Sequence, residues 1–451
     1  MRKLTKRSQM MLYAVSGMGV NMLNLMMGSY LCSALIAGGF AAKDVPFQTF
    51  AGKDLVIAAV WSIFVLIAKI VDGVIDIPMA SFTDQLKSKW GRRRPSLIIG
   101  LVPMIVAYLL FLVVPNPYGA TLLNTIYYGV LLCIFYSFYT LTMVTYYATF
   151  TEIVETEQER GLISNTKSVC DILYFILGYV VVRMLLNGIN IRTVALIVLP
   201  LVLTMLIPLF MIKEESSIDI DSVNANEVKA HSVHLFSSLR YTFKNKTFIK
   251  WMIVYSFMTF SVQLFLGGIN EYFSSVGMNM MLVMICAFAP VPLTLMLYNK
   301  IIKNHGFGAA FRYTLIAFTI GMIAMFFIGR MEGGQTKTIF SVVSGLISSF
   351  AIGAMFAVAY SIPSQLAADE EERTGVTNSA MYFAVQGLFA GVATGIGTGI
   401  VLTALKKASE NATGVPAIAY MTLIAAAGTV IAFILTFILP KELLKLGKKE
   451  K

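Results

Sequence analysis

Three charged side chains interrupt an apolar stretch of the chain and share one helical face. Lys69, Asp72 and Asp76 are spaced at i, i+3 and i+7, and at about 100° per residue this spacing forms a single stripe. A charge at the centre of a bilayer costs on the order of 2.5–3.5 kcal/mol, so all three must face protein or water. Lys69 offsets one carboxylate and leaves one negative charge, which a proton or a monovalent cation would balance. The stripe therefore predicts a coupling-ion site; the alternative is a fixed ion pair beside a permanently protonated aspartate.

The elements that must position this stripe are expected to be membrane-spanning helices. Of the 451 residues, 57% are apolar and 13% are charged, whereas soluble domains carry about 25% charged residues. A spanning helix needs about 20 residues, so the apolar content suffices for about twelve spans. This composition excludes a soluble enzyme, a secreted disulfide scaffold and a disordered chain. The net charge of +11 is explained by basic loops rather than by nucleic-acid binding.

The predicted fold class is an all-α membrane protein with twelve transmembrane helices. They are expected near residues 10–36, 55–80, 95–114, 121–150, 162–187, 191–212, 247–273, 279–302, 312–330, 338–362, 376–405 and 416–440. The longest polar stretch divides six helices from six, a layout typical of duplicated transporter halves. The expected organisation is an N-terminal six-helix bundle at 1–212, a cytoplasmic linker at 213–246, and a C-terminal six-helix bundle with a basic tail at 247–451.

Basic residues are distributed unequally between the two sides of these helices. If both termini are cytoplasmic, 25 of the 35 Lys and Arg residues fall in cytoplasmic segments, 7 in outside loops and 3 within or beside spans. Lys406 and Lys407 are among the seven, in the loop after the eleventh helix. Because cytoplasmic loops carry the basic excess, we expect a multi-pass protein of the cell (inner) membrane with both termini inside.

Two other helices carry unusual patterns. Tyr139, Thr140 and Tyr147 make the helix at 121–150 polar, and we favour a cavity lining over an interfacial aromatic belt. Glycine recurs every fourth residue in the helix at 376–405, which predicts close packing against another helix. Gln386 is the polar side chain beside this glycine face that could reach a ligand.

Charged groups near the helix ends are also candidates. Asp84 followed by Arg92, Arg93 and Arg94 in a short loop suggests a latch that holds one conformation closed, and topology signalling alone is the alternative. Asp171 and the acidic residue Glu271 both fall near helix ends, where extension to the interface is cheap. We therefore interpret these two as interfacial side chains rather than site residues.

The segment KIVDGVIDIPMASFTDQLKSKWGRRRP, residues 69–95, resembles the signature of the glycoside–pentoside–hexuronide:cation symporters. This family is a branch of the major facilitator superfamily that includes the melibiose permease. The resemblance implies two six-helix bundles, alternating access, and uptake of a sugar or glycoside with Na⁺, Li⁺ or H⁺. It assigns Asp72 and Asp76 to the cation site, with Thr140 near that site and Lys69 one turn before it.

The same resemblance implies substrate contacts, with several departures. Tyr139, Tyr147 and Gln386 fall where sugar-contacting groups lie, Tyr147 in place of a tryptophan. The two carboxylates that grip the sugar in the melibiose permease fall at Asn21 and Met143. Two further departures are Gly391, in place of a lysine, and Ile75, in place of an asparagine that helps to coordinate Na⁺. Melibiose is therefore a doubtful substrate, and the loss at Ile75 favours H⁺ over Na⁺ without deciding between them.

The sequence thus predicts a secondary active symporter that takes up a sugar or glycoside with a monovalent cation, H⁺ or Na⁺. A first alternative is a cation-independent facilitator or exporter of amphipathic molecules, which the 26 methionines would suit. A second is a membrane sensor or scaffold, disfavoured because no large soluble domain is evident. We expect no enzymatic activity and no cofactor besides the coupling ion. The expected partners are a small-molecule substrate and membrane lipid but no nucleic acid, and the expected state is a monomer.

Overall fold

The structure is a computed structural model of the 451-residue chain. It describes residues 6–36, 53–153, 163, 166–167, 170–171, 173–186, 188–214, 216, 242–374, 379–410 and 416–446. Every regular element in these ranges is a helix. Ten helices are long and apolar enough to cross a membrane, and the bent pair Met280–Phe288 and Val291–His305 supplies an eleventh. A shorter apolar helix, Leu173–Leu186, lies where the fifth of the twelve spans is expected. The prediction of an all-α, multi-pass membrane fold is confirmed.

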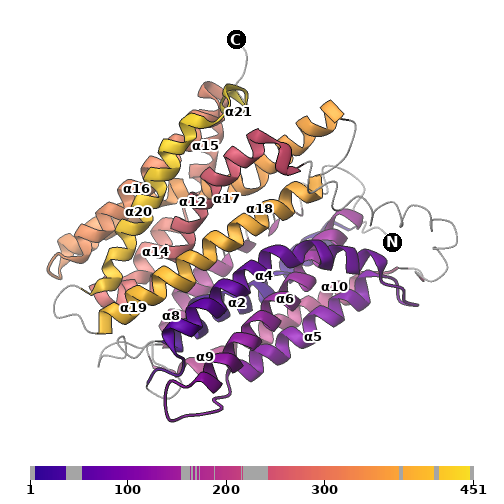
Figure 1. Cartoon of the computed structure of the whole chain (residues 1–451), viewed down its shortest axis with the longest axis horizontal. Coiled ribbons are helices and arrows are strands. Elements are labelled where there is room, and N and C mark those ends of the chain that lie inside the picture. Colours follow the sequence, from indigo (N-terminus) through magenta and orange to yellow (C-terminus); the bar gives the residue numbers. More distant parts are fainter. Residues whose placement is uncertain are drawn as a thin grey trace.

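The helices divide into two groups along the chain. The N-terminal half contains α1 (Arg7–Ser16), α2 (Met18–Leu25), α3 (Cys32–Ala34), α4 (Ala58–Gln85), α5 (Arg93–Phe111), α6 (Leu122–Glu152), α8 (Val182–Leu186), α9 (Ile191–Val198) and α10 (Leu206–Met211). The C-terminal half contains α12 (Lys246–Gly267), α13 (Ile269–Val276), α14 (Met280–Phe288), α15 (Val291–His305), α16 (Phe307–Gly329), α17 (Gln335–Thr374), α18 (Ser379–Thr394), α19 (Leu402–Glu410), α20 (Met421–Leu435) and α21 (Lys441–Lys445). Figure 1 shows the indigo and magenta helices of the first half beside the pink to yellow helices of the second.

Several spans are interrupted where continuous helices are predicted. The span expected at 247–273 breaks between α12 and α13 at Gly268, where an added Cβ would lie 2.4 Å from the sulfur of Met421. The span expected at 279–302 bends by 41° between α14 and α15, ahead of a proline at the start of α15. The span expected at 338–362 is longer, because α17 runs from Gln335 to Thr374. Close packing at Gly268 accompanies the first of these interruptions and proline the second.

The two halves meet closely where α18 and the helical segment that follows it, Gly395–Val401, pack against α4. An added Cβ at Gly391 would lie 2.3 Å from the carbonyl oxygen of Lys69, and one at Gly73 would lie 2.4 Å from the carbonyl oxygen of Gly387. Farther along, an added Cβ at Gly399 would lie 2.9 Å from the carbonyl oxygen of Ser62. The predicted close-packing face is confirmed, since only hydrogen fits at these positions. This contact places the helix with the charged stripe at the boundary between the halves.

One end of the molecule lies away from both chain termini. In Figure 1, α8, α9 and α19 lie at the lower left, whereas the termini are marked at the right and at the top. We call this the distal end and define it by Ser33, Arg183 and Lys406. Lys406 and Lys407, predicted in a loop, instead belong to α19. That part of the prediction is wrong, because the helix continues past the apolar segment.

Candidate functional site

The charged stripe of α4 forms a connected cluster with α6. The Lys69 Nζ lies 3.6 Å from Asp72 Oδ2, and the hydroxyl of Thr140 donates a hydrogen bond of 2.9 Å to Asp72 Oδ1. The same ammonium lies 3.6 Å from the centroid of the Tyr136 ring, which is a cation–π contact. The structure therefore brings together Lys69, Asp72 and Thr140, the grouping that the family resemblance implies. Tyr136 is an additional member that sequence reasoning did not select.

Asp76 lies one helical turn beyond this cluster and faces the other half. Its carboxylate packs against Gly387 of α18, where an added Cβ would lie 3.3 Å from Oδ2. Among the residues that the structure describes, no basic side chain pairs with Asp76. Lys69 is thus engaged with Asp72, and the charge of Asp76 is left without a protein counter-charge in this part of the chain. The carboxylate itself is half-buried.

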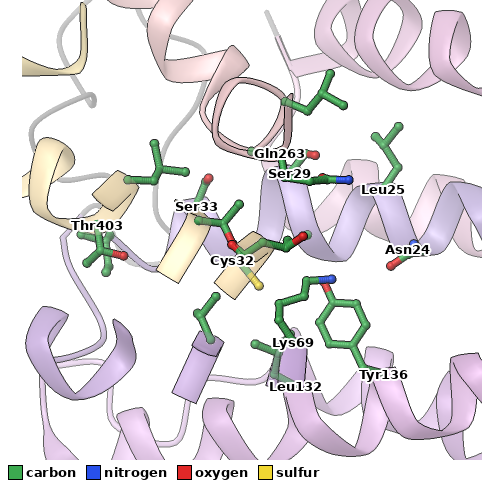
Figure 2. A pocket seen from close by; sticks show the side chains of 18 of the residues that line it. Asn24, Leu25, Ser29, Cys32, Ser33, Lys69, Leu132, Tyr136, Gln263 and Thr403 are labelled. Atoms are coloured by element: carbon green, nitrogen blue, oxygen red, sulfur yellow. The ribbon is translucent and has the colours of Figure 1, made fainter. Parts of the chain in front are cut away.

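A cavity of about 250 Å³ lies between the two halves beside the stripe. Its lining combines amide, hydroxyl, ammonium and aromatic groups, which include Asn21, Asn24, Ser33, Lys69, Tyr136 and Gln263. Figure 2 shows the amine of Lys69 next to the ring of Tyr136, with Ser29 and Gln263 on the other side of the space. Amides and hydroxyls suit the hydroxyl groups of a polar ligand, and aromatic faces suit its apolar surfaces. Because Lys69 borders both the cavity and Asp72, the cavity and the acidic cluster share a side chain.

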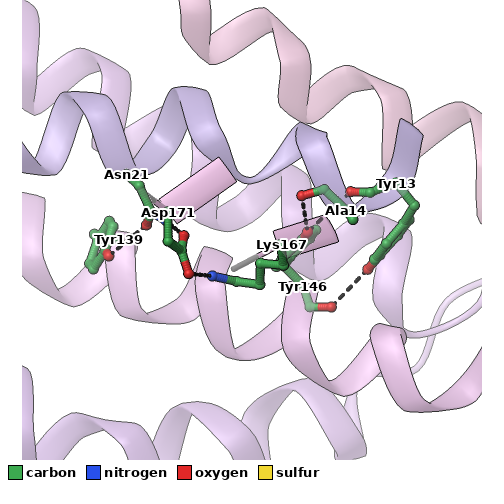
Figure 3. A network of polar contacts seen from close by, with 7 residues as sticks. All are labelled: Tyr13, Ala14, Asn21, Tyr139, Tyr146, Lys167 and Asp171. Carbon is green, nitrogen blue, oxygen red and sulfur yellow. Dashed lines mark hydrogen bonds and ion pairs between the residues drawn. The ribbon is translucent and has the colours of Figure 1, made fainter. Parts of the chain in front are cut away.

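A second polar network joins three helices next to this cavity (Figure 3). The hydroxyl of Tyr139 donates to Asn21 Oδ1 at 3.1 Å, and the Asn21 amide donates to Asp171 Oδ1 at 3.4 Å. Lys167 binds the other oxygen of Asp171 at 2.6 Å, and its Nζ lies 5.2 Å from the ring centroid of Tyr147. The structure therefore connects three residues that were assigned to the substrate. The interfacial interpretation of Asp171 misses these contacts.

The remaining predicted substrate residues lie elsewhere. Met143 is buried in the apolar core, with 5% of its surface exposed, and Gln386 is buried, with 6% exposed. Within the described ranges, Met143, Tyr147 and Gln386 do not line the 250 Å³ cavity. Their roles in substrate binding stay predictions.

The basic loop contacts its own half of the molecule. The backbone N–H of Arg93 donates to Glu214 Oε2 at 2.7 Å, and its guanidinium donates to Thr83 at 3.1 Å. Arg94 donates to the carbonyl of Leu209 at 2.9 Å, and Arg92 is exposed. Thr83 and Leu209 belong to the N-terminal half and Glu214 to the start of the linker, and the side chain of Asp84 lies outside the described residues. A latch between the halves at this loop stays a prediction.

A buried ion pair lies at the distal end, where the sequence predicts interfacial groups. Lys406 Nζ lies 2.7 Å from Glu271 Oε1, and the two side chains are 5% and 0% exposed. The interpretation of Glu271 as an interfacial side chain is wrong, because it is enclosed by protein. Single-residue burial cannot be deduced from position along a helix. The sequence offers one signal for this pairing: Glu271 and Lys406 have opposite charges, and both lie near the same end of their predicted spans.

Comparisons with known proteins give a family and a fold. The family described as MFS/sugar transport protein matches residues 12–440. The lactose permease of Lactobacillus helveticus is 27% identical over 143 residues, which are 31% of this chain and 21% of that protein. The match thus spans about a fifth of the length of that relative.

Solved transporter structures superpose over almost the whole chain. A mutant of the nucleoside transporter NupG has a TM-score of 0.66 at 12% identity and covers 96% of this chain and 100% of its own. A D-xylose-proton symporter has a TM-score of 0.58 at 16% identity, covering 97% and 100%. The inward-open xylose transporter XylE from E. coli has a TM-score of 0.57 at 15% identity, covering 95% and 96%. At these identities the likeness shows the fold.

Proposed function

The chain belongs to the MFS/sugar transport protein family, and from this premise we propose that it is a secondary active symporter. It takes up a sugar or glycoside together with a monovalent cation, by alternating access of a site between the two halves. It is a transporter and not an enzyme. We place it in the cell (inner) membrane with both termini in the cytoplasm, in agreement with the distribution of basic residues.

The observation that carries this proposal is the charge balance around α4. Lys69 and Thr140 engage Asp72, whereas Asp76 has no basic partner among the described side chains. A half-buried carboxylate within an apolar helix is unfavourable when it has no counter-charge, and a bound cation or proton relieves that cost. Because Asp76 packs against Gly387 of the other half, its neutralisation changes the interface at which the halves move. Binding of the cation and the relative movement of the two halves are therefore coupled through the contact between Asp76 and Gly387.

The shared side chain Lys69 supplies the link to the substrate. It lines the 250 Å³ cavity and also lies 3.6 Å from Asp72. A sugar hydroxyl that binds Lys69 weakens its attraction to Asp72, so the substrate and the cation affect each other's affinity. Such a coupling free energy is reciprocal, so the bound cation raises the affinity for the substrate by the same factor as the substrate raises the affinity for the cation.

The proposal is tested by imposing ion gradients on proteoliposomes that contain the purified protein. An inward H⁺ or Na⁺ gradient is expected to concentrate one member of a panel of glycosides above its external level, and collapse of that gradient with an ionophore is expected to abolish the effect. Empty liposomes are the control. Equal fluxes with and without either gradient would show a facilitator in place of a symporter.

Thr140→Val tests the geometry of the ion site at nearly constant volume. The substitution removes the 2.9 Å hydrogen bond to Asp72, and a hydrogen bond to a charged group contributes about 1.5–3 kcal/mol. We expect the apparent affinity for the coupling cation to fall by about tenfold or more, measured as the half-saturating cation concentration for uptake.

Thr145→Val is the matched control on the same helix. Among the described residues, the hydroxyl of Thr145 bonds only the carbonyl of Leu141 within α6, at 2.7 Å. The half-saturating cation concentration for uptake by Thr145→Val is expected to equal that of the wild type. An unchanged cation affinity in Thr140→Val would remove Thr140 from the ion site.

A second candidate function is cation-independent passage of amphipathic molecules. An apolar cavity of about 80 Å³ adjoins the polar one, and the two share Gln263 and Leu266 in their linings. Its methionines are Met258, Met284, Met322, Met325 and Met355. Methionine side chains adapt to irregular apolar ligands, which favours this reading. It predicts fluxes of apolar compounds that no ion gradient alters.

A further inference from the structure

A buried lysine at the distal end bonds both halves of the molecule. Lys406 of α19 donates to the hydroxyl of Ser33 at 2.6 Å and pairs with Glu271 Oε1 at 2.7 Å. Ser33 belongs to α3 in the N-terminal half, whereas Glu271 belongs to α13 in the same half as Lys406. The ammonium thus lies at the junction of three helices, and it also lines the end of the 250 Å³ cavity.

Other polar contacts at the distal end also cross between the halves. Lys407 pairs with Asp54, which precedes α4. Arg183 donates to the hydroxyl of Ser274, next to the pair described above. The amide of Asn270 donates to the backbone carbonyl of Ser29 at 3.2 Å. Together with the bond from Lys406 to Ser33, these contacts join the two halves at the distal end, and Ser29, Ser33 and Lys406 among these residues line the cavity.

We propose that Lys406, with Glu271 as its fixed counter-ion, is the gate residue that closes the cavity at the distal end by bonding Ser33. This role rests on the proposed alternating-access transport, in which the halves must part at this end once in every cycle. Lys406 acts by holding α3 in place and is therefore a positioning residue of the transport cycle.

The distribution of partners explains how such a gate can open. Lys406 and Glu271 both belong to the C-terminal half, whereas Ser33 belongs to the N-terminal half. Of these two partners, Lys406 therefore loses the neutral hydroxyl of Ser33 and keeps the carboxylate of Glu271 when the halves part. The charge of Lys406 therefore keeps its counter-charge, whereas breaking a buried ion pair is unfavourable because it leaves a charge without a partner. Glu271 Oε2 has no hydrogen-bond donor among the described residues, so the carboxylate can take up water or the ammonium in the open state.

Another buried lysine at this end shows the contrast. Lys337 donates to the carbonyls of Val276 at 2.7 Å and Met331 at 3.0 Å, both within the C-terminal half. These hydrogen bonds join the start of α17 to the end of α13 and to the residues that follow α16, all within one half. They need not break when the halves part. Burial of a lysine alone therefore does not identify a gate, whereas a bond across the boundary does.

Cys32 supplies a probe for the opening of the gate. It precedes Ser33, lines the cavity and is half-buried. In a variant that keeps only this thiol (Cys133→Ser, Cys170→Ser, Cys286→Ser), a membrane-impermeant maleimide is added to the distal side of reconstituted vesicles. Ser33→Ala removes the bond across the halves and leaves the Lys406–Glu271 pair intact. We expect labelling of Cys32 from the distal side to rise about tenfold, the population shift that one charge-assisted hydrogen bond supports.

Matched variants separate a gate from a local disturbance. Ser275→Ala removes a hydroxyl at the same end whose one partner in the described part of the chain is the carbonyl of Tyr272, and it should leave the labelling unchanged. The double variant Lys406→Met with Glu271→Gln avoids an unpaired charge, and it should raise distal labelling as Ser33→Ala does. Equal labelling of all variants after denaturation in detergent controls for the amount of protein.

The result that overturns the proposal is unchanged distal labelling in both Ser33→Ala and the double variant while the proteins remain folded and inserted. A rise from both sides of the membrane would indicate loosening of the fold and would also count against a gate. The labelling needs neither a cation nor a sugar. A symport assay that fails together with increased distal labelling would therefore reject the coupling mechanism and keep the gate.

Discussion

Asp72→Asn is expected to reduce cation-driven accumulation of substrate by about 100-fold. The asparagine amide cannot take up a proton or supply a charged ligand, and a hydrogen bond to a charged group contributes up to about 3 kcal/mol. The change also leaves Lys69, 3.6 Å away, with its attraction to a carboxylate removed. Gradient-driven uptake into vesicles is the measurement, with the amount of inserted protein determined in parallel.

Exchange of substrate between the two sides, without any gradient, shows whether the cavity survives. We expect Asp72→Asn to retain part of this exchange, since Asp72 is not among the residues that line the cavity. Glu332→Gln is the control, because Glu332 is an exposed carboxylate in the turn between α16 and α17. Accumulation by Asp72→Asn at the wild-type level would contradict the ion site.

The second large effect is expected at the contact between α4 and α18. Gly391→Ala places a methyl group 2.3 Å from the carbonyl oxygen of Lys69, which is main chain and cannot rotate away. Overpacking of this kind costs about 1–3 kcal/mol, and here the strain falls on the boundary between the halves. We expect the transport rate to fall at least about tenfold and the midpoint of thermal unfolding to decrease.

Gly333→Ala controls for the loss of a glycine as such. No atom of the residues that the structure describes lies within 4 Å of an added Cβ at that position. Its uptake and unfolding midpoint are expected to match those of the wild type. If Gly391→Ala behaves in the same way, then α4 and α18 do not form the close contact on which the proposed coupling depends.

Much of this architecture follows from patterns that a linear sequence contains. Lys69, Asp72 and Asp76 repeat at helical spacing within an apolar run, so their common face could be predicted from geometry alone. Glycine at every fourth position of the helix at 376–405 likewise predicts a helix face without side chains. This pattern does not identify the helix that packs against that face. Both patterns are local, and local periodicity is what helical structure preserves.

The features that sequence reasoning missed depend on segments far apart in the chain. Asn21 and Asp171 are 150 positions apart, and Ser33 and Lys406 are 373 apart. Glu271 and Lys406 both lie near helix ends, where hydropathy cannot distinguish a side chain that reaches water from one enclosed by neighbouring helices. The break at Gly268 also has a tertiary cause, since Met421 and Leu402 occupy the space beside it.

The glycine at 391 constrains how the specificity of this protein can be redesigned. The resemblance to the melibiose permease matches Gly391 to a lysine, and reintroduction of that lysine is the most direct way to test for the sugar specificity of that protein. Here the main chain of α4 occupies the space beside Gly391, so a lysine side chain at this position would push α4 and α18 apart and would not reach a ligand. Altered selectivity should instead be sought at Asn24 and Gln263, whose side chains border open volume.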